Sequence, residues 1–174
     1  MSFAIWLTGL PASGKSAIAR ELLRELHGQG IDAAALESDV MRTQLTPFAR
    51  YDDAERDLFY AVLAELGSFL VRRARPVIID ATANRRRYRD AARERIARFC
   101  EVYVDTPLEL CKARDPKGLY RASGAGRAGS FPGTQAPYEP PLAPELVVHG
   151  ERSTPQQAAA RIVAHLAARG WLPR

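Results

Sequence analysis

The sequence predicts an α/β domain built as a three-layer sandwich, with helices on both faces of a mostly parallel five-stranded sheet. Three observations predict this fold. Short apolar segments alternate along the chain with longer segments of helical periodicity. A glycine-rich loop joins the first apolar segment to the first helical one. The chain has 174 residues, 47% of them hydrophobic, which suits one domain with its own core.

The strands are expected where short apolar segments lack polar alternation. Phe3 to Thr8 has no polar face, as a central parallel strand covered by helices requires. The other strands are expected at 32–36, 76–80, 99–104 and 146–149. Because helical segments separate most of these strands, parallel pairing is the expected arrangement.

Helices are expected between the strands. The first follows the glycine-rich loop and ends near Gly28, where the helical spacing of apolar residues stops. A long helix is expected to pack against the sheet through Leu58, Val62, Leu66 and Phe69. The remaining helices are expected at 85–98, 108–114 and 155–169.

The segment 115–144 departs from this alternation. It is rich in glycine and proline, shows no periodicity, and is longer than a connection between elements needs. Its scattered aromatic residues, Tyr120, Phe131 and Tyr138, favour a lid that orders over a ligand, and the alternative is a disordered insertion. We therefore interpret residues 1–174 as a single domain with a lid at 115–144.

The net charge of +5 suits an acidic partner, such as a nucleotide, a sulfate ester or a nucleic acid, without choosing among them. No apolar run is long enough to span a bilayer, and the first residues lack the features of a secretion signal. A cytoplasmic protein is therefore expected, with Cys100 and Cys111 as buried thiols. The only lysines are Lys15, Lys112 and Lys117, which favours a chemical role for a lysine.

Residues 9–16 fit the pattern G-x-x-x-x-G-K-S between a strand and a helix. The residues expected to bind the nucleotide are Gly9, Leu10, Pro11, Ala12, Ser13, Gly14, Lys15 and Ser16. Glycines let backbone N–H groups point at phosphate oxygens, Lys15 neutralises the β- and γ-phosphates, and Ser16 holds Mg²⁺. The charge of Lys15 is expected to serve only bound phosphates. A glycine turn that merely links strand to helix would explain neither the lysine nor the serine, so we predict a P-loop kinase that uses ATP and Mg²⁺.

A second motif specifies the kind of kinase. The stretch from Val102 to Tyr120, VYVDTPLELCKARDPKGLY, resembles the corresponding stretch of adenylylsulfate (APS) kinases. The likeness continues through FPG at 131–133, PYEPP at 137–141 and PELV at 144–147. The resemblance implies transfer of phosphate from ATP to the ribose 3′-hydroxyl of adenosine 5′-phosphosulfate, which yields the activated sulfate donor.

The resemblance also implies residues for the acceptor. The segment 36–42, LESDVMR, is similar to the family's L-D-G-D-N-V-R, which implies that Asp39 is catalytic and holds the acceptor hydroxyl or the magnesium shell. Arg42 is implied to pair with the substrate's sulfate or phosphate. Tyr51 and Arg56 resemble the family's F-S-x-x-D-R, in which the aromatic stacks on the substrate adenine and the arginine meets its charge. For Arg56 the alternative is a solvated helix face.

Three further residues lie in or beside the expected lid. Lys117 and Phe131 match lid positions of the family, one cationic and one that stacks on the substrate. Arg114, just before the lid, is implied to cover the adenine of ATP, and a surface salt bridge is its alternative.

The sequence departs from the family pattern where the acceptor is expected to bind. Phe59 stands where the family has asparagine, Gly129 where it has a lid lysine, and Glu37 where it has aspartate. Ala83 replaces a serine, which excludes a phosphorylated serine intermediate at this position. A different small-molecule acceptor or a polynucleotide end therefore remains an alternative, and a nucleotide-binding module without turnover is a third.

Asp80 ends the predicted strand 76–80, where many P-loop kinases keep an acid for magnesium or for the acceptor's proton. It is a third candidate catalytic residue, and a helix cap is its alternative. The arginines at 85, 86, 87 and 89 either grip phosphates or form a solvated face. The expected partner is a small-molecule nucleotide, with no membrane and no nucleic acid, and a homodimer is left open.

Overall fold

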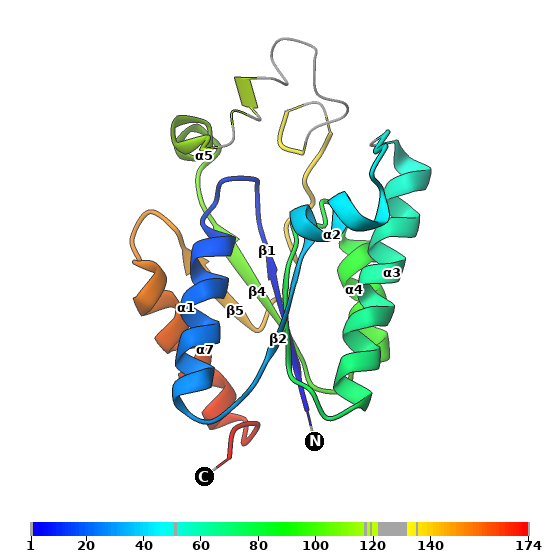
Figure 1. Cartoon of the computed structure of the whole chain (residues 1–174). Coiled ribbons are helices and arrows are strands. Elements are labelled where there is room, and N and C mark those ends of the chain that lie inside the picture. The colour runs from blue at the N-terminus through cyan, green and yellow to red at the C-terminus, as the bar shows by residue number, and fades with distance from the viewer. Residues whose placement is uncertain are drawn as a thin grey trace.

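The computed structural model describes residues 2–50, 52–116, 118, 120–121, 132–134 and 136–173. Its sheet consists of β1 (Ala4–Thr8), β2 (Ala34–Glu37), β3 (Val77–Asp80), β4 (Phe99–Asp105) and β5 (Leu146–His149). The strands lie in the order β2-β3-β1-β4-β5, and every neighbouring pair is parallel (Figure 1). The strand before the glycine-rich loop is therefore central, as its apolar sequence predicted.

The described helices are α1 (Lys15–Gly28), α2 (Ser38–Leu45), α3 (Asp53–Arg72), α4 (Arg86–Arg95), α5 (Leu108–Arg114) and α7 (Pro155–Ala168). The pair α1 and α7 covers one face of the sheet, and the pair α3 and α4 covers the other (Figure 1). Two hydrophobic cores lie on the two faces of the sheet. Ile5 and Leu7 of β1 belong to the core shared with α1 and α7, while Ala4 and Trp6 belong to the core shared with α3 and α4, because successive strand residues face opposite sides. The predicted three-layer α/β sandwich is confirmed.

The face through which α3 packs was predicted correctly only in part, since Leu66 packs against the core but two other predicted residues do not. Leu58 is 66% exposed and Phe69 is 45% exposed, whereas Phe59 and Leu63, on the adjacent side of the helix, are buried. A small residue explains which face packs against the sheet. A Cβ on Gly67 would lie 2.9 Å from the Ile79 side chain of β3, so the helix lies close to the sheet at this glycine. A search for large apolar side chains does not detect such a face.

The helix α2 was not expected from the sequence. None of its residues is buried, so it lacks the apolar stripe that a search for helical periodicity detects. It follows β2 directly and carries Asp39 in its first turn and Arg42 in its last. An unpredicted helix therefore presents two of the predicted site residues.

Part of the expected lid, namely residues 117, 119, 122–131 and 135, lies outside the described residues. Cys100 and Cys111 are both free and buried, as predicted, and burial raises the pKa of the Cys100 thiol to about 12. Within the described ranges, no helix combines the length and apolar character needed to cross a membrane.

Candidate active site

The glycine-rich loop after β1 leads directly into α1. Gly9 has a φ of 150°, and a Cβ on it would lie 2.5 Å from the Val104 carbonyl oxygen, so only glycine fits. Gly14 precedes α1 with a φ of 109°, and no side chain of the described residues caps this helix end. The first N–H groups of α1 are therefore available to an anion, which the helix dipole also favours.

The loop contains a buried hydroxyl and is braced from two sides. Ser13 is buried, and its Oγ has no hydrogen-bond partner in the described part of the chain, so a phosphate oxygen would supply one. Thr106 Oγ1 donates to the Ser13 carbonyl over 2.9 Å, and the Tyr120 hydroxyl donates to the Pro11 carbonyl over 2.9 Å. The sequence analysis missed both braces because they join residues 93 and 109 positions apart.

Lys15 begins α1 and is only 7% exposed. Its Nζ donates to the Gly9 carbonyl over 3.1 Å and to the Leu10 carbonyl over 2.8 Å. The expectation that its charge serves only phosphates was therefore too narrow, because the ammonium also ties the loop together. Ser16, which follows in the first turn, is exposed.

Asp80 is the last residue of β3 and is buried at the edge of the sheet from which the phosphate loop leaves. It lies in register with Leu7 of β1 and Glu37 of β2. The residue at the cap of α4 is Arg85, so the alternative that Asp80 caps this helix is wrong. Loops at the carboxyl edge of a parallel sheet are where α/β proteins gather ligands.

The predicted acceptor residues lie on α2 and α3. Asp39 is exposed on the first turn of α2. Arg42 donates from Nη1 to Glu55 Oε1 over 3.0 Å, and its guanidinium carbon lies 4.0 Å from the centre of the Phe59 ring. Arg56 is buried, so the alternative of a solvated helix face is wrong for this residue.

Arg42 and Arg56 converge on one buried tyrosine. Burial raises the pKa of Tyr60, while the positive charges of Arg42 and Arg56 and hydrogen bonds from Arg42 and the Ala83 N–H oppose this rise. Arg42 also donates to Glu55, the residue that precedes Arg56 in the chain. The two cations that the family resemblance implies for the acceptor thus come from neighbouring parts of α2 and α3.

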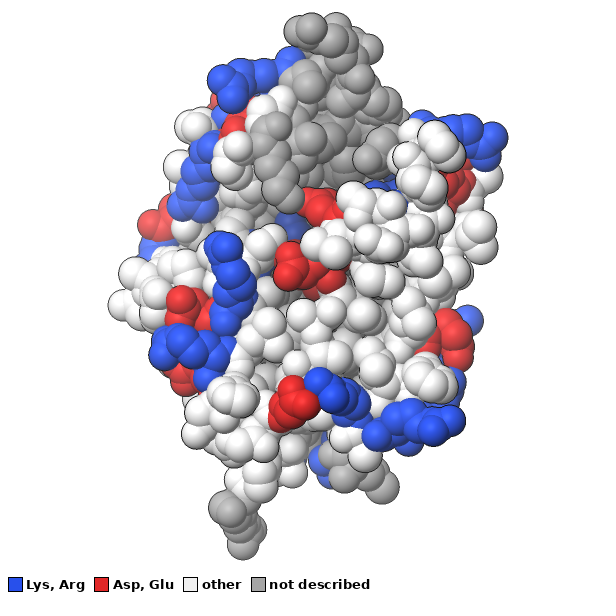
Figure 2. Space-filling model, viewed as in Figure 1, with Lys and Arg blue, Asp and Glu red and all other residues white. Residues whose placement is uncertain are grey.

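The arginines at the start of α4 pair with carboxylates of α3. Arg85 lies 2.6 Å from Asp53, and Arg87 lies 2.5 Å from Asp57. Figure 2 shows basic and acidic side chains interleaved over the viewed face rather than gathered in one basic patch. Among the described residues, this face therefore shows no continuous basic groove of the kind by which proteins follow a nucleic-acid backbone.

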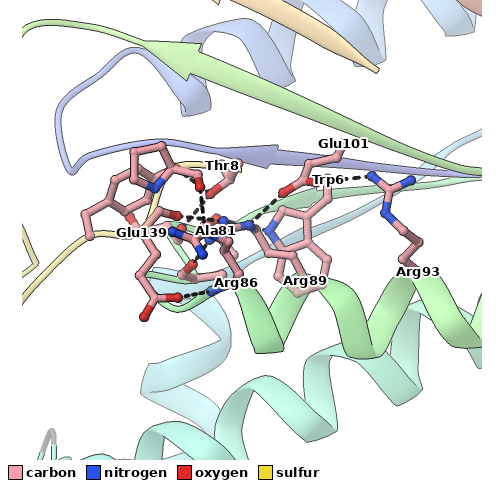
Figure 3. Close-up of polar contacts among 12 residues, drawn as sticks. Trp6, Thr8, Ala81, Arg86, Arg89, Arg93, Glu101 and Glu139 are labelled. Carbon is pink, nitrogen blue, oxygen red and sulfur yellow. Dashed lines mark hydrogen bonds and ion pairs between the residues drawn. The ribbon is translucent and has the colours of Figure 1, made fainter. Parts of the chain in front are cut away.

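Arg89 is the centre of a buried polar network that the sequence analysis missed (Figure 3). The side chain is 1% exposed, and its Nε donates to Glu101 Oε1 of β4 over 2.7 Å. Its two other nitrogens donate to the carbonyls of Ala83 and Glu139, the latter over 2.7 Å. Arg93 extends the network by contacting Glu101 and Glu145. A charge in an arginine-rich helix thus joins three segments far apart in sequence.

The loop after β3, residues 81–84, is held along its length. Trp6 Nε1 donates to the Ala81 carbonyl over 3.1 Å, and Thr8 Oγ1 donates to the Thr82 carbonyl over 2.7 Å (Figure 3). Arg89 donates to the Ala83 carbonyl, and the Glu139 N–H donates to the Asn84 carbonyl over 2.8 Å. Glu139, which belongs to the expected lid, therefore helps to fasten this edge of the site.

Arg114 ends α5 beside the phosphate loop. Its Nη2 donates to the Gly150 carbonyl over 2.9 Å, and its Nη1 lies 4.0 Å from the position that a Cβ on Gly14 would take. The observed partner is a carbonyl rather than the carboxylate of a surface salt bridge. The predicted site residues Tyr51, Lys117 and Phe131, together with Gly129, lie outside the described residues.

Comparison with known proteins identifies the family. The family model for adenylylsulphate kinase matches residues 1–149. The chain belongs to this family. The adenylyl-sulfate kinase of Rippkaea orientalis is 35% identical over 170 residues, which is 98% of this chain and 94% of that protein. The adenylyl-sulfate kinase of Citrobacter koseri is 40% identical over 150 residues, covering 85% and 75%.

Solved structures agree with the family assignment. The adenylylsulphate kinase of Mycobacterium tuberculosis, in complex with AMPPNP and APS, superposes with a TM-score of 0.90 at 32% identity, covering 95% of this chain and 98% of that one. The shikimate kinase of Aquifex aeolicus superposes with a TM-score of 0.61 at 18% identity, covering 97% and 98%, which shows the shared fold alone. This member of the adenylylsulphate kinase family thus keeps the fold. Of the positions at which the sequence analysis expected departures from the family, Phe59 contacts the guanidinium of Arg42 and Ala83 is buried.

Proposed function

We propose that this chain transfers the γ-phosphoryl group of ATP to the ribose 3′-hydroxyl of adenosine 5′-phosphosulfate. One observation supports it most strongly: the phosphate loop with Lys15 and the arginine pair Arg42 and Arg56 lie on opposite sides of Asp80 at the carboxyl edge of one sheet. A donor nucleotide and an anionic acceptor have separate sets of recognition groups there. The related M. tuberculosis enzyme was solved with AMPPNP and APS, a nucleotide pair of this kind.

On the donor side, the loop from Gly9 to Ser16 binds the phosphates of ATP. Its N–H groups and the Lys15 ammonium stabilise the negative charge on the β- and γ-phosphates. Arg114, held at the Gly150 carbonyl beside the loop, covers the adenine. The Ser16 hydroxyl and the Asp80 carboxylate would hold Mg²⁺, which neutralises phosphate charge when bound. This set fits Mg²⁺, which binds through few protein carboxylates together with substrate phosphates.

On the acceptor side, Asp39 orients the 3′-hydroxyl and accepts its proton. The hydroxyl oxygen forms a bond to the γ-phosphorus as the bond between this phosphorus and the β,γ-bridging oxygen breaks, so that ADP leaves. Arg42 and Arg56 bind the 5′-phosphosulfate, and Tyr51, Phe131 and Lys117 complete the acceptor site. A phosphorylated serine intermediate at position 83 is excluded, since Ala83 offers no hydroxyl.

The proposed reaction is tested by following the label from ATP labelled at the γ-phosphate. Incubation with Mg²⁺ and adenosine 5′-phosphosulfate should give a labelled product that carries the phosphate at the 3′ position. The 3′-deoxy analogue of the acceptor is the control, and it should take no label. Label on the 3′-deoxy analogue, or none on the phosphosulfate, would contradict the proposal.

We expect Arg42→Ala to raise the KM for the phosphosulfate by roughly 10- to 100-fold, because a charge-assisted contact to the acceptor is lost. The KM for ATP should stay within about two-fold of the original value. The matched control is Arg87→Ala, which also removes an arginine paired with an α3 carboxylate but is not one of the residues assigned to the acceptor. Steady-state kinetics with each substrate varied in turn measures both. Equal losses for ATP and acceptor would show that Arg42 serves the donor.

The proposed activity also implies a compartment. Its donor is ATP, and the two cysteines are free thiols of the kind found in reducing compartments. We therefore place the enzyme in the cytoplasm, where fractionation of cells that carry a tagged chain would locate it.

A further inference from the structure

Tyr60 of α3 lies beneath the acceptor side of the site. Its ring is buried, stacks on Tyr88 with 4.5 Å between ring centres, and meets the edge of Phe59 at 5.3 Å. Its hydroxyl accepts a hydrogen bond from the Ala83 N–H over 3.1 Å. A phenol is thus fixed with its one polar atom pointing at the loop after β3.

The Ala83 backbone needs such a partner. Ala83 has a φ of 42°, in the left-handed region that costs a residue with a side chain about 1 kcal/mol or more. The residue is fully buried, so its N–H cannot bond to water. The Tyr60 hydroxyl on the N–H and the Arg89 guanidinium on the carbonyl hold this conformation from opposite sides.

Tyr60 also lies beside the cation assigned to the acceptor. The Arg42 guanidinium carbon lies 5.8 Å from the Tyr60 ring centre and 4.0 Å from that of Phe59. Burial raises the pKa of the Tyr60 phenol, and the positive charge of Arg42 opposes this rise. Tyr60 therefore lies between α2 and the loop after β3. In the sequence, α3 and β3 lie between these two segments.

We propose that the Tyr60 hydroxyl is a positioning group for the acceptor, holding the Arg42 guanidinium and the Ala83 backbone in register so that the 5′-phosphosulfate meets a preformed site. Tyr60 supplies a hydroxyl at the backbone of residue 83, where the side chain of Ala83 has none. The identity of the acceptor rests on the proposed function, whereas the link between Arg42 and Ala83 does not.

The test compares two substitutions that each remove one phenolic oxygen from the same stacked pair. Tyr60→Phe removes the oxygen that accepts from the Ala83 N–H, whereas Tyr88→Phe removes one that donates to Asp57 of α3. We expect Tyr60→Phe to raise the KM for the phosphosulfate on the order of 3- to 10-fold, with the KM for ATP within about two-fold. Tyr88→Phe should leave both values unchanged.

A second readout does not depend on activity. Amide hydrogen exchange at Ala83, followed by NMR, should become faster in Tyr60→Phe and stay unchanged in Tyr88→Phe, because only the first loses the acceptor of this N–H. Unchanged exchange in Tyr60→Phe would overturn the positioning role whatever the acceptor is. Normal kinetics of Tyr60→Phe in an enzyme that turns over the phosphosulfate would also overturn it and leave the proposed function standing. Absence of turnover by the unmodified enzyme would overturn the proposed function itself and, with it, the acceptor assigned to Tyr60.

A double variant with both Ala83→Ser and Tyr60→Phe tests whether a hydroxyl at residue 83 can replace the hydroxyl of Tyr60. The serine restores a hydroxyl beside the backbone of residue 83, so we expect part of the loss in acceptor KM to be recovered. A double variant no better than Tyr60→Phe would overturn the equivalence of the two hydroxyls.

Discussion

Lys15→Met should lower kcat/KM by roughly 10²- to 10³-fold or more, since a preorganised charge on the transferred phosphoryl group contributes that much to phosphoryl transfer. The ammonium already lies in the loop, bonded to the Gly9 and Leu10 carbonyls, so its stabilisation requires little rearrangement when ATP binds. Steady-state kinetics with Mg²⁺ and ATP measures the effect. The fold should persist, because α1 and β1 are held by apolar packing that the substitution leaves in place.

The control for this variant is Lys112→Met. Lys112 pairs with Glu109 within α5 and is one of the two other lysines in the chain. Its replacement should leave kcat/KM unchanged within about two-fold. Normal turnover in Lys15→Met, or an equal loss in both variants, would contradict the role of the phosphate loop.

Arg89→Met should destabilise the fold by about 3–5 kcal/mol, the cost of leaving a buried charge without its main partner. Glu101 is buried and would keep only Arg93, while the carbonyls of Ala83 and Glu139 would lose their donor. Urea denaturation measures the free energy of unfolding. The acceptor KM should rise as well, because the loop 81–84 loses one of its fixed points.

The matched control is Arg87→Met on the same helix. Arg87 makes an ion pair of similar length with Asp57, but its side chain is exposed, so we expect no measurable loss of stability. Equal losses of unfolding free energy in the two variants would show that the contribution of the Arg89–Glu101 pair to stability does not depend on its burial. A small loss in Arg89→Met alone would mean that the network relaxes around the substitution.

The features that the sequence predicted correctly are local in the chain. The strand β5 was predicted with its observed bounds, and β1 and β4 to within one residue, because each is a short apolar segment between polar turns. The phosphate loop is likewise a continuous motif, and α1 begins at its Lys15. Such features can be predicted from the sequence because the residues that determine them are neighbours in the chain.

The features that the sequence did not predict depend on contacts between distant segments. Arg89 was grouped with surface arginines because its burial follows from Glu101 and Glu139, which no spacing rule connects to it. The inward face of α3 depends on Gly67 fitting against Ile79, so a search for large apolar residues selected Leu58 instead. Tyr60 gave no signal for the same reason, since its role depends on the backbone of Ala83.

The most direct test of the proposed function is the kcat/KM of the unmodified enzyme for different acceptors. ATP consumption with Mg²⁺ is followed with adenosine 5′-phosphosulfate, adenosine 5′-monophosphate, sugars and a 5′-hydroxyl oligonucleotide. We predict that the kcat/KM for the phosphosulfate exceeds that for the sugars by a factor on the order of 10² or more, because the sugars offer no anionic group to Arg42 and Arg56, and that it also exceeds the values for the monophosphate and the oligonucleotide. Faster turnover of another acceptor, or tight binding of ATP without turnover of any, would contradict the account.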